Sequence, residues 1–148
     1  MYLFMILISH RGNLNGPKPN MENSPEYIEI AIKKNFHVEI DVWIKKNNFY
    51  LGHDEPVHEV NKEYLENKKF WCHAKNIEAM EALKNINTNY FWHQNDDVVL
   101  TSNGYFWTYP GKKLLSNSIC VLPEKTNQQN FSCAGICSDF IENYKFLK

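Results

Sequence analysis

Acidic, basic and imidazole side chains recur where short apolar segments end. The segment ILIS runs directly into His10 and Arg11, and a later segment, YLG, runs into His53. Two imidazoles can serve phosphodiester cleavage together, because one removes a proton from the nucleophile and the other donates a proton to the leaving oxygen. An arginine binds phosphoryl oxygens and stabilises the charge that develops on them. The joint placement of these residues, rather than either histidine alone, indicates phosphate chemistry.

A pair of acids lies in the segment HVEIDVW, where a single residue separates Glu39 from Asp41. On a β-strand both carboxylates project from the same face. Two like charges held so close are costly unless a cation neutralises them, and Mg²⁺ or Ca²⁺ is the usual cation for oxygen ligands. The alternative is an exposed strand with two solvated acids. The nearby histidines and arginine favour a metal site.

Hydrophobic patterning predicts the elements that would position these residues. The segment SPEYIEIAIKKN predicts a helix, with Ser24 as its N-cap, Pro25 in its first turn and lysines at its end. A second helix is expected from Asn76 onward, and a short one near NKEYLEN. Short apolar or aromatic runs predict strands at 2–9, 37–43, 48–53, 69–74, 89–93, 97–101, 104–109, 118–122 and 134–138.

The order strand, helix, strand over the first 43 residues predicts a βα unit and a parallel sheet that is buried on both faces. After residue 90 the gaps between strands are too short for full crossover helices. A Phe-Trp pair recurs in KFWCHAK, YFWHQND and YFWTYPG. We expect these large side chains to fill or seal a small barrel, the alternatives being carbohydrate stacking and a lipid-facing surface.

Composition is typical of a globular domain, which we expect to span 1–148. The net charge of −1 leaves no broad basic surface, so we expect no nucleic-acid partner. The four cysteines lack zinc-site spacing and are expected to be buried thiols in a reducing compartment. The apolar N-terminal run has no basic flank and is too short to cross a bilayer, so we expect a buried strand, no transmembrane segment and a cytoplasmic protein.

Four motifs in the order HRG, ENS, EID and GHD resemble the pattern HRG, PENT, E-x-D and HD of the glycerophosphodiester phosphodiesterase family, within the phospholipase C-like phosphodiesterases. The segments FWCHAKN, YFWTY and AGICSDF resemble later strands of that family, with large deletions between them. The resemblance implies an α/β fold, a compact (β/α)8 TIM-type barrel with the site at the C-terminal ends of its strands. Such a barrel needs about 250 residues, so several outer helices must be reduced or missing.

The same resemblance implies an activity and the residues that carry it. It implies a metal-dependent phosphodiesterase of lipid metabolism that hydrolyses glycerophosphodiester-like or headgroup phosphodiesters, which are small substrates. His10 and His53 resemble the family's acid–base pair, while Arg11 and Lys75 resemble its phosphate-binding residues. Whether the nucleophile is water or a hydroxyl group of the substrate is left open.

For the metal, Glu39 and Asp41 resemble two of the family's ligands, but the third acid, expected two residues before Lys75, is replaced by His73. An imidazole can bind a metal but removes a negative charge, which weakens binding of Ca²⁺ and favours Mn²⁺ or Zn²⁺. Alternatively Glu22, from the ENS motif that braces the family's site, supplies the third carboxylate, or the site binds metal poorly.

The remaining polar residues receive simpler interpretations. His93 and Asp96 follow a predicted strand and are candidate substrate contacts, whereas Asp139 is expected to brace the barrel or cap a turn. His37 and His58 are expected to be surface or strand-end residues. A barrel without its outer helices exposes apolar surface, which predicts a homo-oligomer. The alternative function is a phosphate or sugar-phosphate binding module with little or no catalysis.

Overall fold

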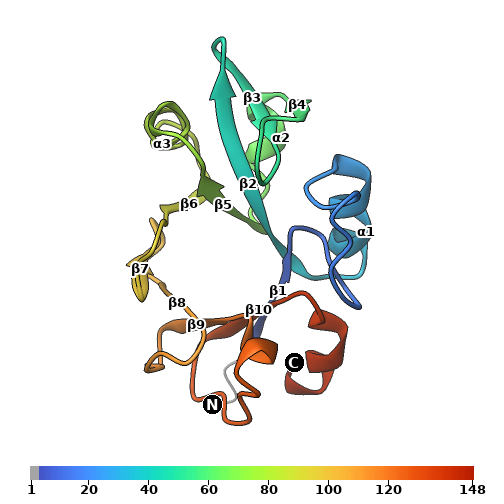
Figure 1. The fold of residues 1–148 in the computed structure, drawn as a ribbon, viewed down its shortest axis with the longest axis vertical. Helices are drawn as coiled ribbons and strands as arrows, with labels where there is room; N and C mark the ends of the chain where they lie inside the picture. Colours follow the sequence, from blue (N-terminus) through green and yellow to red (C-terminus); the bar gives the residue numbers. More distant parts are fainter. Residues whose placement is uncertain (1–3) are drawn as a thin grey trace.

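The computed structural model describes residues 4–148, so the first residues of the strand predicted at 2–9 lie outside it. The chain forms one strongly curled mixed sheet of ten strands, which Figure 1 shows as an incomplete ring seen end-on. Its parallel part runs in the order β6, β5, β2, β1, β10, β9, β8. These strands are Asn89–Trp92, Phe70–Ala74, His37–Lys45, Ile6–His10, Gly135–Ser138, Ser118–Val121 and Phe106–Thr108.

Antiparallel strands extend the sheet at two places. The long strand β2 pairs through its second half with β3 (Asn48–Leu51), which pairs in turn with β4 (His58–Val60). At the other end β7 (Val98–Leu100) pairs antiparallel with β8. The backbone N–H of Ser102 donates to the carbonyl of Tyr90, so the end of the β7–β8 hairpin reaches β6.

Helices cover only part of the outer face. The helix α1 (Pro25–Lys33) joins β1 to β2, and α3 (Ile77–Leu83) joins β5 to β6, while α2 (Lys62–Leu65) is a single turn. Among the described residues, the later connections carry one 3₁₀ helix, Pro123–Lys125, and a second, Ile141–Leu147, follows the last strand. No helix in this part of the chain is long and apolar enough to cross a lipid bilayer.

The predicted (β/α)8 TIM-type barrel is therefore wrong. The sheet is a curled half-barrel with antiparallel additions rather than eight repeats of strand and helix. The physical reason lies in the connections after β6, because a parallel crossover with a covering helix needs a dozen or more residues. A short turn joins β6 to β7, and β7 forms an antiparallel hairpin with β8 where the barrel would have a crossover helix.

Local signals explain the elements that do form. Ser24 caps α1 by accepting a hydrogen bond from the backbone N–H of Tyr27, and Pro25 occupies the first turn. Asn61 and Asn76 cap α2 and α3 in the same way. All nine predicted strands and the three predicted helices occur near their expected positions, and β4 is the strand that patterning missed.

Two apolar clusters lie on the two faces of the curled sheet. One packs between the sheet and the helices and includes Ile28, Phe36 and Phe70. The other fills the inside of the curl, where the ring of Trp107 contacts the rings of Trp71 and Phe91. One aromatic residue of each Phe-Trp pair thus points inward, which confirms that these pairs fill the interior.

Candidate functional site

The residues that could take part in catalysis or metal binding gather at the C-terminal edge of the parallel strands. A cavity of about 1060 Å³ opens there, at the upper end of the range for small-molecule sites. Its lining includes all the predicted site residues except Asp41, which lies fully buried beneath it, and Asp96, which lies at the rim. The predicted lining residues are His10, Arg11, Glu22, Glu39, His53, His73, Lys75 and His93.

Parallel pairing explains why the acids and the two strand histidines meet. In the sheet register His10 lies beside Glu39 on the neighbouring strand, and Asp41 lies beside His73. The atoms are correspondingly close: His10 Nε2 lies 3.7 Å from Glu39 Oε2, and His73 Nδ1 lies 3.1 Å from Asp41 Oδ1. Glu39, Asp41 and His73 form a group whose ligand atoms all lie within 4.8 Å of one another.

This group of Glu39, Asp41 and His73, the triad below, has the features of a cation site. Glu39 Oε2 and Asp41 Oδ1 are buried oxygens without a hydrogen-bond partner among residues 4–148. His73 donates its Nε2–H to the carbonyl of His93 at 3.2 Å, which turns Nδ1 toward the two carboxylates. A histidine whose far nitrogen is held by a carbonyl is the usual arrangement of a metal ligand. The triad can therefore hold a metal ion.

The two acids of the triad differ in their surroundings. Burial, with the neighbouring charge of Asp41, raises the pKa of Glu39 well above its usual range. Burial acts in the same direction on Asp41, but contacts with His53 and His73 and the charge of Arg11 outweigh it and hold the pKa of Asp41 well below its usual range. Asp41 is thus the acid that the protein itself keeps ionised, and Glu39 is the one that needs a further cation.

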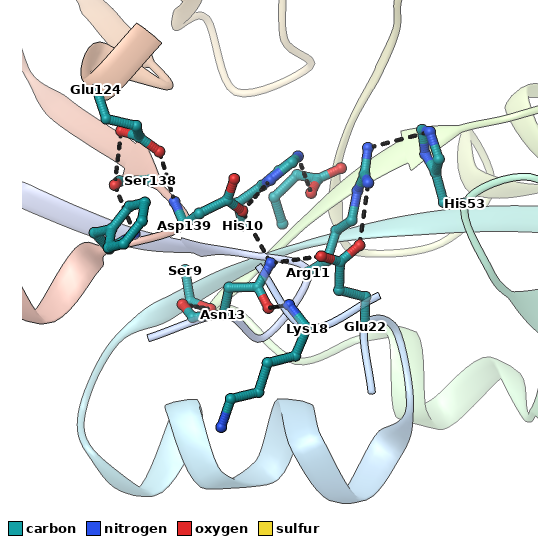
Figure 2. A network of polar contacts seen from close by, with 12 residues as sticks. Ser9, His10, Arg11, Asn13, Lys18, Glu22, His53, Glu124, Ser138 and Asp139 are labelled. Atoms are coloured by element: carbon teal, nitrogen blue, oxygen red, sulfur yellow. Dashed lines mark hydrogen bonds and ion pairs between the residues drawn. The ribbon is translucent and has the colours of Figure 1, made fainter. Parts of the chain in front are cut away.

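Arg11 lies between two of the carboxylates rather than free in the cavity. Its Nη1 lies 3.2 Å from Glu22 Oε2, and its Nε lies 3.2 Å from Asp41 Oδ2. The remaining Nη2 donates to Nε2 of His53 at 3.4 Å, as Figure 2 shows. Lys75 Nζ lies 3.9 Å from Asp41 Oδ1. Both cations border the space above the triad, where a phosphate could reach them.

Glu22 braces the site from the loop that precedes α1. It accepts hydrogen bonds from Arg11 and from Nδ2 of Asn13, and it lies outside the triad. The next residue, Asn23, donates from Nδ2 to Asp41 Oδ2 at 2.9 Å and accepts the backbone N–H of Asp41 through its own side-chain oxygen. Asn23 adopts a left-handed φ of 63°, which asparagine tolerates better than most residues.

Sequence analysis expected Asp139 to brace the barrel or cap a turn, and missed that it is the most direct partner of His10. Asp139, at the end of the last strand, accepts a hydrogen bond from His10 Nδ1 at 2.7 Å and another from Asn13 Nδ2 at 2.9 Å (Figure 2). The backbone N–H of Asp139 donates to Glu124 Oε1, which fixes the strand end. The signal that could have found Asp139 is its position, since it directly follows a buried strand that is parallel to β1.

A second missed residue is Tyr109, which directly follows β8 and whose ring stacks on His93 at a centroid distance of 3.7 Å. Burial, with the charge of Glu39, raises the pKa of Tyr109, so its hydroxyl stays protonated. Burial, with the nearby His73 and Lys75, lowers the pKa of His93 to about 4 even though Asp96 opposes this shift. Both rings line the cavity, and both are neutral at physiological pH.

His37 and His58 are each the first residue of a strand, β2 and β4, which confirms the expected strand-end positions. His37 is largely buried at the opposite end of β2, where it accepts a hydrogen bond from Trp71 Nε1 at 3.1 Å. His58 contributes to the rim of the cavity. All four cysteines are free thiols, as expected, and three of them are buried.

Comparison of this chain with protein family models, with curated proteins and with solved structures finds no match.

Proposed function

We propose that this chain is a metal-dependent phosphodiesterase that hydrolyses glycerophosphodiester-like or headgroup phosphodiesters. The observation that carries the proposal is the meeting of two histidines, two cationic side chains and a buried carboxylate group at one cavity. Six acids lie at the cavity, Glu22, Glu39, Asp41, Asp54, Glu55 and Asp139, against three cations, Arg11, Lys75 and Lys125. A divalent cation on the triad would offset most of that excess of negative charge.

The donor set supports a particular class of cation. Two carboxylates and one imidazole offer mixed oxygen and nitrogen ligands, whereas Ca²⁺ takes six to eight oxygens. We therefore expect Mn²⁺ or Zn²⁺ to bind more tightly than Ca²⁺, with Mg²⁺ weaker than Mn²⁺. When bound, such an ion would polarise the phosphoryl group and neutralise charge on it.

The chain's own groups would carry out the proton transfers. Each histidine lies beside one acid of the pair: His10 Nε2 is 3.7 Å from Glu39 Oε2, and His53 Nδ1 is 3.5 Å from Asp41 Oδ2. One imidazole takes the proton of the attacking water or hydroxyl group as its oxygen bonds to phosphorus. The other donates a proton to the ester oxygen as its bond to phosphorus breaks. A phosphomonoester, or a cyclic phosphate if a substrate hydroxyl attacks, and an alcohol result.

Lys75 and Arg11 would hold the phosphoryl oxygens during this exchange. Lys75 has a single acid contact, at 3.9 Å, and is therefore the better placed of the two for an incoming phosphate. Arg11 would exchange part of its contact with Glu22 or His53 for the phosphate, and the left-handed backbone at Arg11, with a φ of 57°, turns its side chain over the triad.

The test is hydrolysis of bis(4-nitrophenyl) phosphate and of a glycerophosphodiester by metal-free protein supplied with Mn²⁺, Zn²⁺, Mg²⁺ or Ca²⁺. We expect Mn²⁺ or Zn²⁺ to restore activity, and His10→Ala to lower kcat by about 10²-fold or more. Glu29→Gln, an exposed acid on α1, is the matched control for loss of a charge elsewhere. Metal-independent rates that are the same in wild type and His10→Ala would refute the enzyme.

The second candidate is a phosphate or sugar-phosphate binding module. One observation favours it: His73 stands in the triad in place of a third acid, which weakens the binding of hard divalent cations. The two candidates give different results in one experiment. A binding module would bind a sugar phosphate in calorimetry without turning over either diester, and a phosphodiesterase would release 4-nitrophenol in the presence of metal.

A further inference from the structure

The cavity has a second wall, which contributes no ligand atom to the triad. The ends of β6 and β8 form it, on the left of Figure 1, while β1 and β2 lie on the right. Its centre is the stacked pair of His93 and Tyr109, whose rings lie 3.7 Å apart at an interplanar angle of 21°. Trp92, Gln94 and Trp107 line the cavity around this pair.

This aromatic wall is held in place by the same residues that shape the triad. The carbonyl of His93 accepts the Nε2–H of His73, and the backbone N–H of Tyr109 donates to the carbonyl of Asp97. The turn between β6 and β7 is therefore anchored at both ends. Because the wall and the triad face one cavity, an ester arm of a phosphate held above the triad can reach the wall.

The shape of the wall selects a flat, neutral ligand. His93 and Tyr109 already contact each other, so no ring fits between them, and only their cavity-facing surface is open to a ligand. An aromatic face in a partly polar cavity packs well against the apolar face of a cyclic polyol or sugar. Gln94, at the rim, offers an amide donor and acceptor for ring hydroxyl groups.

The charged residues that line the cavity on the strands flanking the wall are lysines, whereas Asp96, whose Oδ2 lies 3.8 Å from His93 Nδ1, lies outside the lining. Lys75 follows β5 and Lys125 follows β9, the strands that flank β6 and β8, and both lysines line the cavity. A quaternary ammonium group bound to the wall would share the cavity with these two positive charges. A neutral ring with hydroxyl groups meets no such repulsion and can accept hydrogen bonds from both ammonium groups.

We infer that the stacked pair of His93 and Tyr109 is a subsite for a neutral sugar or cyclic-polyol ring carried on one ester arm of the substrate. This inference rests on the proposed function, because it assumes that the triad and its cations hold the phosphate. It names the class of diester that the site prefers, a sugar or cyclitol phosphodiester over a choline or short-chain one.

Binding of phosphomonoesters tests the subsite without requiring catalysis. Wild-type protein with Mn²⁺ is titrated in a calorimeter with methyl phosphate, phosphocholine, adenosine 5′-monophosphate, glucose 1-phosphate and inositol 1-phosphate. We expect glucose 1-phosphate and inositol 1-phosphate to bind about tenfold more tightly than methyl phosphate. Phosphocholine should bind no more tightly than methyl phosphate. Tyr109→Ala should remove the preference, and Tyr109→Phe should keep most of it because the ring face remains.

Tyr50→Ala is the matched control, since Tyr50 lies on the β3–β4 hairpin outside the cavity and its hydroxyl donates to Glu59. Equal binding of all five ligands, tighter binding of phosphocholine or the nucleotide, or a ring preference that survives Tyr109→Ala would each overturn the subsite. A ring preference that depends on Tyr109, in a protein that hydrolyses no diester, would retain the subsite and refute the enzyme. Diester hydrolysis with equal kcat/KM for methyl and sugar arms would retain the enzyme and refute the subsite.

Discussion

Asp139 Oδ1 lies 2.7 Å from Nδ1 of His10, and this contact joins two residues that are 129 positions apart in the chain. The carboxylate accepts the Nδ1 proton, so the lone pair of the neutral ring lies on Nε2, which faces Glu39 and the cavity. Asn13 bridges Asp139 to Glu22 by donating to both acids. The position of the ring and its tautomer are therefore set by the last strand of the sheet.

Asp139→Asn tests this contact. The amide can donate a proton to Nδ1 of His10 where the carboxylate accepts one, so the ring would favour the tautomer with a proton on Nε2. We expect kcat for diester hydrolysis to fall by about 10²-fold with a small change in KM. The pH profile of kcat should also change, which loss of a purely structural residue would not cause.

Glu142→Gln is the control for Asp139→Asn. Glu142 lies just beyond the same strand and accepts a hydrogen bond from Lys34 Nζ at 2.6 Å, away from the cavity. Its replacement should leave kcat unchanged and cost at most about 1 kcal/mol of stability. An Asp139→Asn protein with wild-type kcat and pH profile would show that the contact does not tune His10.

Metal binding should stabilise the fold through the triad. A ligand present at a hundred times its Kd adds about 2.7 kcal/mol to the free energy of unfolding, which raises Tm by about 5 °C or more for a domain of this size. We expect Mn²⁺ to give this shift in thermal unfolding, and a chelator to reverse it. Glu39→Gln should remove the shift, while Glu29→Gln should keep it.

The choice of metal should depend on His73. Replacing this imidazole by a carboxylate, in His73→Glu, adds a negative charge and a hard oxygen ligand. We expect the ratio of Ca²⁺ to Zn²⁺ affinity to rise by about tenfold or more, as measured by calorimetry. An unchanged ratio would indicate that His73 is not a ligand. A Ca²⁺ preference already present in the wild type would contradict the proposed cation class.

Stability should fall with decreasing pH partly because of His37. Burial, with the charges of Lys69 and Lys148, lowers its pKa to about 4, and the hydrogen bond from Trp71 needs an unprotonated Nδ1. The unfolded chain, in which the histidine pKa is near 6.5, binds the proton first. The stability contributed by neutral His37 is therefore complete above about pH 7 and is lost progressively down to about pH 4.

Urea unfolding at about pH 7.5 and about pH 5 measures this loss. We expect His37 to account for up to about 2 kcal/mol of the difference between the two conditions, and His37→Gln to show a smaller difference than wild type. The variant is itself less stable at the higher pH, so the comparison uses each protein's own change with pH. Parallel changes in the two proteins would contradict a buried, neutral His37.

Gly12 tests how tightly the HRG turn is packed. Its φ is +94°, and a Cβ there would lie 2.7 Å from Cδ1 of Tyr27. Gly12→Ala should cost about 1–3 kcal/mol of stability from overpacking in addition to backbone strain. Gly104→Ala is the matched control, because its φ is +84° and no atom lies within 4 Å of the added carbon. Equal losses in urea unfolding would show that Tyr27 moves aside freely.

The amino-acid sequence determined the local structure of this protein and the kinds of residue in its candidate site. Some features depend on interactions between near neighbours in the chain: caps such as Ser24, short apolar strands and inward-pointing aromatic residues. They can therefore be predicted from the sequence. The acid pair Glu39 and Asp41 was predictable for the same reason, because alternation along one strand puts both carboxylates on one face.

Only the tertiary structure decided how the strands join and which distant side chains meet. The hairpin of β7 with β8 replaced the crossover helices of the expected barrel, pairing of β1 with β10 brought Asp139 to His10, and the curl of the sheet brought Tyr109 to His93. Such contacts depend on the pairing of strands that are far apart in the chain, and no local periodicity or capping signal encodes that pairing. Side chains at strand ends were therefore predictable as candidates, whereas their partners came from the curl of the sheet.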